Sequence, residues 1–159
     1  MLWADAESAA FIDPLAPPDD PAFWDWADAC CAGRTVAVLE TIAFHRRDRD
    51  AFAARYGASP AAPRGVVARP LELVGETIYW LPGPRALIPG DTIVGTGGGE
   101  LAQCPPSWLE EMGTRPAPAE LRAALVELLA LEPELVLVSH GEPARSGGAA
   151  ALARALGAA

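Results

Sequence analysis

The stretch RTVAVLETIAFHRRD, residues 34–48, decides the fold class. Its centre, residues 36–39, is an unbroken run of aliphatic and β-branched residues, which is typical of a strand buried on both faces. Polar residues follow at once, and His45 and Asp48 are among them. Because α/β sheets place ligands where buried strands end, the stretch predicts an α/β protein with a candidate site directly after this strand.

Two further apolar runs end in the same way. ALIP, residues 86–89, is followed by Asp91, and LVLV, residues 135–138, is followed by His140. Both histidines of the chain therefore come directly after predicted strands. Imidazole nitrogen and carboxylate oxygen are ligands that borderline divalent metals favour, so His45, Asp91 and His140 are candidate metal ligands. Taken singly, each histidine also fits an ordinary surface or hydrogen-bonded residue, and Asp91 fits a turn.

Helices are predicted between the strands. Asp20 and Pro21 form a good start for a helix to about residue 32, and Asp48 can cap a second helix that stops at Gly57. Residues 119–131 carry leucines at helical spacing, which predicts one apolar face. Helices alternating with buried strands and hairpins predict one layered domain, residues 1–159, with mixed sheets covered by helices.

Composition excludes several classes of function. The chain has 159 residues and a net charge of −9, and all twelve basic residues are arginine, a usage typical of a GC-rich bacterial genome. An acidic chain does not suit a nucleic-acid partner, and no apolar run reaches the ~20 residues of a membrane span. The start of the chain lacks the pattern of a signal peptide. The three cysteines make a poor disulfide framework, so we expect a cytoplasmic protein.

The order of these motifs resembles a known family. Ile12-Asp13-Pro14, VAVLET before a histidine-containing loop, ALIPGDTIVG and ELVLVSHGEP together are similar to the metallo-β-lactamase-fold hydrolases, most of all to their glyoxalase-II-like branch. The resemblance spans about residues 9–156. It implies an αββα sandwich with a metal site at one edge, and it implies that some N-terminal strands of the family are missing or reduced.

The ligand motif itself is only partly present. The family motif His-x-His-x-Asp-His overlays residues 43–48, where its second histidine matches His45. Its aspartate falls on Arg47 and its last histidine on Asp48. The bridging aspartate matches Asp91 and the final histidine His140, whereas the histidine expected before them has no match in residues 70–80. A permanent positive charge at Arg47 opposes a two-metal centre by several kcal/mol at an effective dielectric near 20.

Three functions remain open. In the first, the chain is a degenerate member without a competent two-metal site, impaired in catalysis or a small-molecule-binding protein, with Arg47 paired to Asp91 or Asp48. In the second, one divalent metal, zinc or iron, persists on His45, Asp91 and His140, with Asp48 as a further ligand or as the group that activates water. That protein would hydrolyse a thioester, lactone or phosphoester. The third is a non-catalytic interaction protein.

Two weaker expectations concern surfaces. The resemblance places substrate-facing loops after Asp91, so Cys104 and Trp108 are candidates for a ligand pocket, although plain packing also explains them. The aromatic segment FWDW, residues 23–26, offers more apolar surface than one helix needs, which predicts a homodimer. The glycine-rich residues 96–99 predict a flexible loop.

Overall fold

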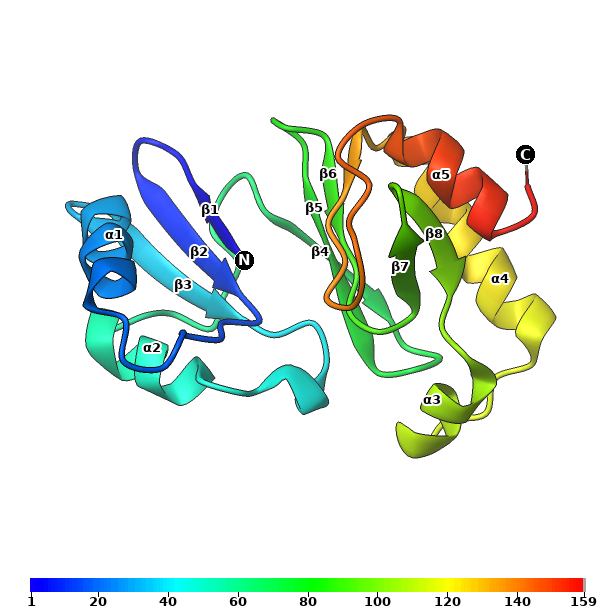
Figure 1. Ribbon diagram of the computed structural model, residues 1–159, viewed down its shortest axis with the longest axis horizontal. Helices are drawn as coiled ribbons and strands as arrows, with labels where there is room; N and C mark the ends of the chain where they lie inside the picture. Colours follow the sequence, from blue (N-terminus) through cyan, green and yellow to red (C-terminus); the bar gives the residue numbers. More distant parts are fainter. Residues whose placement is uncertain (159) are drawn as a thin grey trace. The chain divides into compact units, whose positions relative to one another are not determined.

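The computed structural model describes residues 1–158 and divides into two compact units. Unit 1 is Met1–Val66, and unit 2 begins at Val67. Each unit contains a mixed sheet with helices packed on it, as the sequence predicted, and the elements of each can be followed in Figure 1. The single-domain boundary 1–159 stays a prediction.

Unit 1 is built on a three-stranded sheet. Its strands lie in the order β1-β2-β3; β2 pairs antiparallel with β1 and parallel with β3. The parallel register sets Ile12 beside Leu39, so the chain leaves both strands at the same edge. The elements of the unit are β1 (Leu2–Ala4), β2 (Ser8–Ile12), α1 (Pro21–Cys31), β3 (Thr35–Leu39), the 3-10 turn η1 (Ala43–His45) and α2 (Arg49–Tyr56).

The helix ends of unit 1 largely follow the predicted signals. The carboxylate of Asp20 accepts a hydrogen bond from the main-chain N–H of Phe23 at 3.2 Å, and α1 begins at Pro21. Helix α2 ends at Gly57, whose φ of 58° suits a residue without a Cβ. Asp48 occupies the N-cap position of α2, but its side chain makes no capping hydrogen bond. Its carboxylate has another partner, described below.

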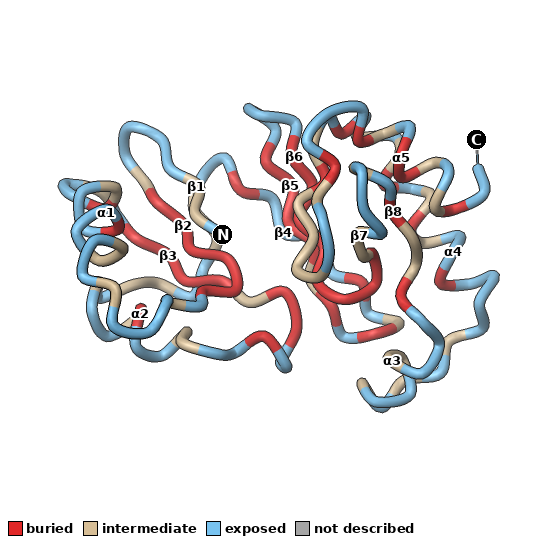
Figure 2. The backbone as a smooth tube through the Cα atoms, in the orientation of Figure 1, coloured by how far each residue is buried: buried red, intermediate tan, exposed pale blue. Residues whose placement is uncertain are grey.

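The core of unit 1 lies between the sheet and its two helices. Phe52 of α2 is fully buried and meets the ring of Phe11 of β2 edge-on, with 4.7 Å between the ring centroids. Figure 2 shows that β2 and β3 are buried along most of their length. Burying one such phenylalanine stabilises a fold by about 1.5–3 kcal/mol, so this aromatic contact is a main reason why α2 stays on the sheet.

Unit 2 contains a four-stranded sheet in the order β4-β5-β6-β9 and a separate hairpin of β7 and β8. Strands β4, β5 and β6 are antiparallel neighbours, and β9 runs parallel to β6. The elements are β4 (Val67–Leu71), β5 (Glu76–Leu81), β6 (Ala86–Ile88), β7 (Ile93–Gly97), β8 (Glu100–Gln103), α3 (Pro106–Glu111), α4 (Pro118–Val126), the 3-10 turn η2 (Glu127–Leu131), β9 (Leu135–Val136) and α5 (Gly148–Ala155).

Two segments of unit 2 differ from the sequence prediction. In the segment predicted as a flexible loop, Gly97 ends β7 and pairs with Glu100, and Gly98 and Gly99 form the hairpin turn, both with positive φ. The predicted helix 119–131 ends as an α-helix at Val126 and continues as a 3-10 turn to Leu131. Its apolar face is used as expected, since Leu121 and Leu125 are buried in the core of the unit.

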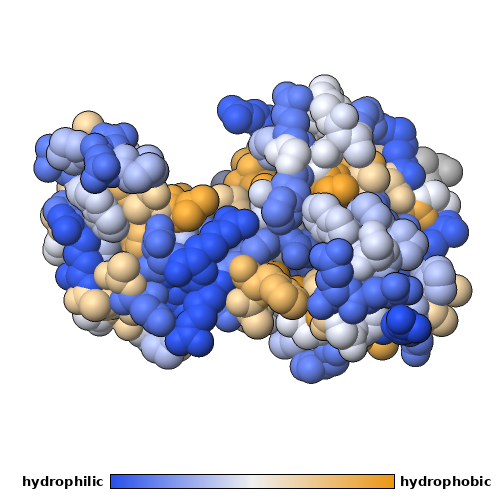
Figure 3. Space-filling view, turned by 60° about the horizontal axis from the view of Figure 1, so that its bottom comes forward, coloured by the Kyte–Doolittle hydropathy of each residue, from blue (hydrophilic) through white to orange (hydrophobic). Residues whose placement is uncertain are grey.

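The surface carries several exposed apolar side chains. Leu15, Trp26 and Phe44 of unit 1 are exposed by 62%, 51% and 63%. Figure 3 shows apolar residues among hydrophilic ones on one face. Among residues 1–158, no helix has the length and apolar character needed to cross a bilayer. Cys30, Cys31 and Cys104 are free thiols.

Candidate functional site

In unit 1, a buried hydrogen-bond network follows the ends of β2 and β3. Asp13 comes directly after β2 with a φ of 48°, and its main-chain N–H donates to the carbonyl of Leu39 at 3.0 Å. One oxygen of its carboxylate, Oδ1, accepts the N–H of Thr41 at 2.8 Å. The other, Oδ2, accepts the Thr41 hydroxyl at 2.6 Å and meets Nδ1 of His45 at 2.9 Å. All three side chains are buried.

This network assigns the tautomer of His45. A carboxylate only accepts hydrogen bonds, so the proton of the neutral ring belongs on Nδ1, where it is donated to Asp13. The lone pair of the imidazole then lies on Nε2, which is the nitrogen that can ligate a metal. Thr41 Oγ1, 3.1 Å from Nδ1, lies beside the same hydrogen bond. Asp13 thus orients the predicted ligand His45, although neither Asp13 nor Thr41 was among the predicted site residues.

Arg47 and Asp48 follow His45 in the same loop. Oδ2 of Asp48 accepts the main-chain N–H of Ala16 at 2.8 Å, and the Asp48 N–H donates to the Pro14 carbonyl at 3.3 Å. Asp48 therefore ties the segment after β2 to the loop that carries His45. Arg47 is exposed and adopts a positive φ of 36°. Among residues 1–158, it forms no ion pair with Asp48.

In unit 2, Asp91 lies in a turn that closes around a second buried carboxylate. Glu76, at the start of β5, is 1% exposed. Its Oε1 accepts hydrogen bonds from the Gly90 N–H at 2.9 Å and from the Thr92 hydroxyl at 2.8 Å. Its Oε2 accepts the N–H groups of Asp91 and Thr92, both at 2.9 Å. Burial raises the pKa of Glu76, and the hydroxyl and main-chain donors act in the opposite direction.

Asp91 and His140 form the part of the predicted site that lies within unit 2. Oδ1 of Asp91 is 3.1 Å from Nε2 of His140. The side chain of Asp91 is 12% exposed and that of His140 is 42% exposed, so the pair opens to solvent on the histidine side. Trp108 of α3 meets the His140 ring edge-on, with 5.1 Å between ring centroids. A carboxylate and an imidazole at this distance offer one oxygen and one nitrogen to a cation.

The loop that carries His140 is held by the main chain of β7. The N–H of Gly95 donates to the His140 carbonyl at 2.9 Å. A Cβ at Gly95 would overlap the main chain of Glu142, and a Cβ at Gly141 would overlap the main chain of Gly95. Gly141 also has a φ of 81°. Glycine is therefore required at both positions for this loop to approach β7.

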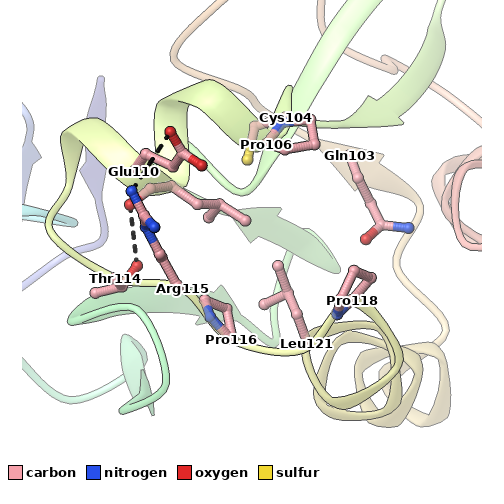
Figure 4. A pocket seen from close by; sticks show the side chains of 10 residues that line it. Gln103, Cys104, Pro106, Glu110, Thr114, Arg115, Pro116, Pro118 and Leu121 are labelled. Carbon is pink, nitrogen blue, oxygen red and sulfur yellow. Dashed lines mark hydrogen bonds and ion pairs between the residues drawn. The ribbon is translucent and has the colours of Figure 1, made fainter.

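A separate pocket lies in unit 2 between α3 and the start of α4. Its cavity is about 200 Å³, and Figure 4 shows Cys104, Glu110, Arg115 and Leu121 among the side chains that line it. Burial, together with the negative charges of Glu76 and Asp91, raises the pKa of Cys104 to about 11. Cys104 thus lines this cavity, and its part in binding a ligand stays a prediction. The other predicted lining residue, Trp108, packs on His140 and is not part of this lining.

The three predicted metal ligands come from both units of the structure. Asp91 and His140 come together in unit 2, while His45 belongs to unit 1 with Asp13 and Thr41. Glu76 was not predicted as a site residue, because a single carboxylate at the start of a strand carries no local signal. The antiparallel pairing of β5 with β6 is the signal that could have identified Glu76. Tyr79 pairs with Ile88 at the end of β6, so the start of β5, which carries Glu76, runs alongside the turn that follows β6.

Comparison with solved structures identifies the fold. The structure of VMB-1 matches 98% of this chain and 81% of its own chain with a TM-score of 0.60 and 15% identity. The DIM-1 metallo-β-lactamase matches 98% and 83% with a TM-score of 0.59 and 14% identity. The chain has the metallo-β-lactamase fold. ETHE1 from Myxococcus xanthus is a further match, over 91% of this chain and 71% of its own, with a TM-score of 0.58 and 18% identity.

At the level of the metallo-β-lactamase fold, the resemblance read from the sequence is confirmed. TM-scores of 0.58–0.60 over 91–98% of the chain establish this fold at identities of 14–18%. No family model matches the chain, and no curated protein matches it. The function must therefore be argued from the chain's own residues.

Proposed function

We propose that this protein holds one divalent metal, zinc or iron, on His45, Asp91 and His140, and that it hydrolyses a small thioester, lactone or phosphoester. The observation that carries the proposal is the buried pair of Asp13 and His45, 2.9 Å apart. Histidines that ligate metals usually donate their other ring N–H to a carboxylate or carbonyl, which fixes the tautomer and the ring orientation. His45 has such a partner in Asp13, which leaves Nε2 as the nitrogen that can bind a metal.

The donor set suits the proposed metal. Two imidazole nitrogens and one carboxylate oxygen are three protein ligands, and catalytic zinc sites combine three protein ligands with one open position. Asp91 and His140 support the proposal by their distance of 3.1 Å and by the exposure of His140. His45 is included because the motif order along the chain supports it and because the shared fold spans 98% of the chain.

One metal is proposed rather than two because the second set of ligands is incomplete. Arg47 stands where the family motif has an aspartate, and residues 70–80 contain no histidine. A guanidinium at this position removes one carboxylate ligand and adds a positive charge, so Arg47 opposes a second cation. The chain has two histidines in total, fewer than a two-metal centre of this fold requires.

Each residue of the proposed site has a separate role. A bound divalent metal polarises a carbonyl or phosphoryl oxygen and acidifies water. Asp13 keeps the proton of His45 on Nδ1, and Trp108 limits the rotation of the half-exposed His140 ring. Asp48 is proposed as a further ligand or as the base toward water. Its hydrogen bond to Ala16 means that a change at Asp48 also alters the loop.

Metal analysis of protein purified without added metal tests the proposal. We expect about one zinc or iron per chain, and we expect the metal to be lost in His45→Ala, Asp91→Asn and His140→Ala. Glu111→Gln, which removes an exposed acid of α3, is the control and should retain the metal. A parent protein that takes up no zinc, manganese or iron(II), with no rise in its melting temperature, would contradict the proposal.

The pocket of unit 2 favours a second candidate, a metal-free small-molecule-binding protein. Its cavity of about 200 Å³ is smaller than most ligand sites, so it would admit a fragment-sized molecule. Such a protein would gain thermal stability from a small organic ligand and none from metal. An interaction protein without either ligand is the third candidate. For it we propose a homodimer through exposed apolar side chains such as Trp26, which light scattering at micromolar concentration would detect.

A further inference from the structure

The turn that carries Asp91 is organised by a side chain from another strand. Glu76 on β5 approaches the turn through the antiparallel register of β5 and β6, which pairs Tyr79 with Ile88. The start of β5, which carries Glu76, therefore runs alongside the turn that follows β6. The turn folds around the Glu76 carboxylate, which accepts the main-chain N–H groups of Gly90, Asp91 and Thr92 at 2.9 Å each.

Only a carboxylate fits this position. Four donors converge on Glu76: three main-chain N–H groups and the Thr92 hydroxyl. A glutamine has one acceptor oxygen and would turn its NH₂ group toward at least one of these donors. Burying a carboxylate at 1% exposure is unfavourable unless its hydrogen bonds are complete, and an apolar side chain would fill a strand position at lower cost. The unfavourable burial of the Glu76 carboxylate indicates that this turn needs a fixed geometry.

The fixed geometry reaches Asp91 itself. The N–H groups of Asp91 and Thr92, on either side of the Asp91 Cα, are both hydrogen-bonded to Glu76. The backbone position from which the Asp91 side chain extends is therefore fixed. Its Oδ1 then lies 3.1 Å from His140 Nε2, close to the limit of a useful hydrogen bond. A small displacement of the turn would therefore separate these two groups. The far side of the turn is held as well, because the Cys104 N–H donates to the Thr92 carbonyl at 3.0 Å.

We propose that Glu76 is a positioning residue for Asp91, and that its carboxylate sets the affinity of the site for a divalent cation without touching the cation. The effect on affinity rests on the proposed metal site, whereas the effect on the turn does not. Among residues 1–158, no arginine or histidine lies at ion-pair distance from Glu76. Its negative charge is therefore not neutralised by a neighbouring cationic side chain and favours a cation at Asp91.

The test compares Glu76→Gln with Leu125→Ala. Leu125 is fully buried in the core of unit 2, and its side chain is purely apolar. Its truncation therefore lowers stability without removing any hydrogen bond of the turn. Two quantities are measured: the zinc dissociation constant by calorimetry, and amide hydrogen exchange at Gly90, Asp91 and Thr92 by NMR. Exchange is compared with that of the β5 amides in the same protein.

For Glu76→Gln we expect a zinc dissociation constant raised at least tenfold. We also expect at least tenfold faster exchange at the three turn amides than at β5. In Leu125→Ala, both quantities should stay within about twofold of the parent, although the melting temperature falls. Parent-like exchange at the three amides in Glu76→Gln overturns the proposal, as does an unchanged dissociation constant.

Two further outcomes separate the proposals. If the parent binds no zinc, the proposed function fails, and exchange at the turn amides alone decides the role of Glu76. If Glu76→Gln does not fold, Thr92→Val replaces it, because it removes only the hydroxyl hydrogen bond to Glu76 and keeps the shape of the side chain. Thr92→Val should then speed exchange at Gly90 and Asp91 severalfold, and unchanged exchange would overturn the proposal.

Discussion

Replacing Asp13 by asparagine tests the network that orients His45. The carboxylate accepts the N–H of Thr41 on Oδ1, and the Thr41 hydroxyl and His45 Nδ1 on Oδ2. Asparagine keeps one acceptor oxygen and places an NH₂ group against the other donors. Its backbone cost is small, because asparagine tolerates the φ of 48° found at this position. The substitution therefore isolates the effect of the side chain.

The expected loss in the free energy of unfolding follows from the two hydrogen bonds to Oδ2 of Asp13. Hydrogen bonds to charged groups contribute about 1.5–3 kcal/mol each, so losing two at the low end of this range costs about 3 kcal/mol. For a chain of this length the melting temperature should fall by about 6–12 °C. Both side chains of the Asp13–His45 pair are less than 5% exposed, so solvent does little to replace the lost partners.

Urea unfolding followed by tryptophan fluorescence and circular dichroism measures the loss. The control is the same chemical change at Asp20, whose side chain caps α1 through Phe23. Asparagine caps a helix as well as aspartate, so Asp20→Asn should stay within about 0.5 kcal/mol of the parent. If Asp13→Asn were as stable as Asp20→Asn, the buried network could not be what fixes His45, and the tautomer argument would fail with it.

Three further outcomes are expected. Gly95→Ala should cost about 2–3 kcal/mol, because its Cβ would overlap the main chain of Glu142. Gly83→Ala, where a Cβ meets nothing within 4 Å, should change stability by less than about 0.5 kcal/mol in the same urea titration. Leu125→Ala should cost about 2–5 kcal/mol by the same measurement, and a neutral result would mean that α4 is not part of the core. At pH 7.5 iodoacetamide should label Cys104 only after unfolding, since its pKa of about 11 leaves little thiolate; peptide mass mapping that finds native Cys104 labelled as fast as Cys30 would refute this.

The sequence predicted those parts of the fold that carry local signals. Asp20 with Pro21 predicts the start of α1, and Gly57 predicts the end of α2. The structure has both helix ends at these residues. Strand β1 was not predicted, because three residues are too few to show an alternating pattern. The helix that starts at Pro118 was predicted from its leucine spacing, but its change to a 3-10 turn after Val126 leaves that spacing intact and so gives no warning.

The candidate site divides in the same way. Asp91 and His140 could be selected because each follows a buried strand, and the structure sets them 3.1 Å apart. Asp13 also follows a buried strand, but the positions of Asp13 and Glu76 along the chain do not show which groups their carboxylates meet. Asp13 meets Thr41 through the parallel pairing of β2 with β3, and Glu76 meets the main chain of Asp91 because β5 pairs with β6 and the turn follows β6. Such groups are found only when the pairing of strands is known.

The close approach of Gly95 and Gly141 has a practical consequence for engineering. The His140 loop is anchored through main-chain atoms at Gly95 and Gly141, and the carboxylate of Glu142 adds a side-chain anchor by accepting the N–H of Gly98 at 2.8 Å. A library that varies Trp108, whose ring meets the His140 ring, while keeping both glycines and Glu142 should retain the loop's course and vary what surrounds the imidazole. The surroundings of the imidazole can thereby be changed while the main-chain anchors of the loop stay in place.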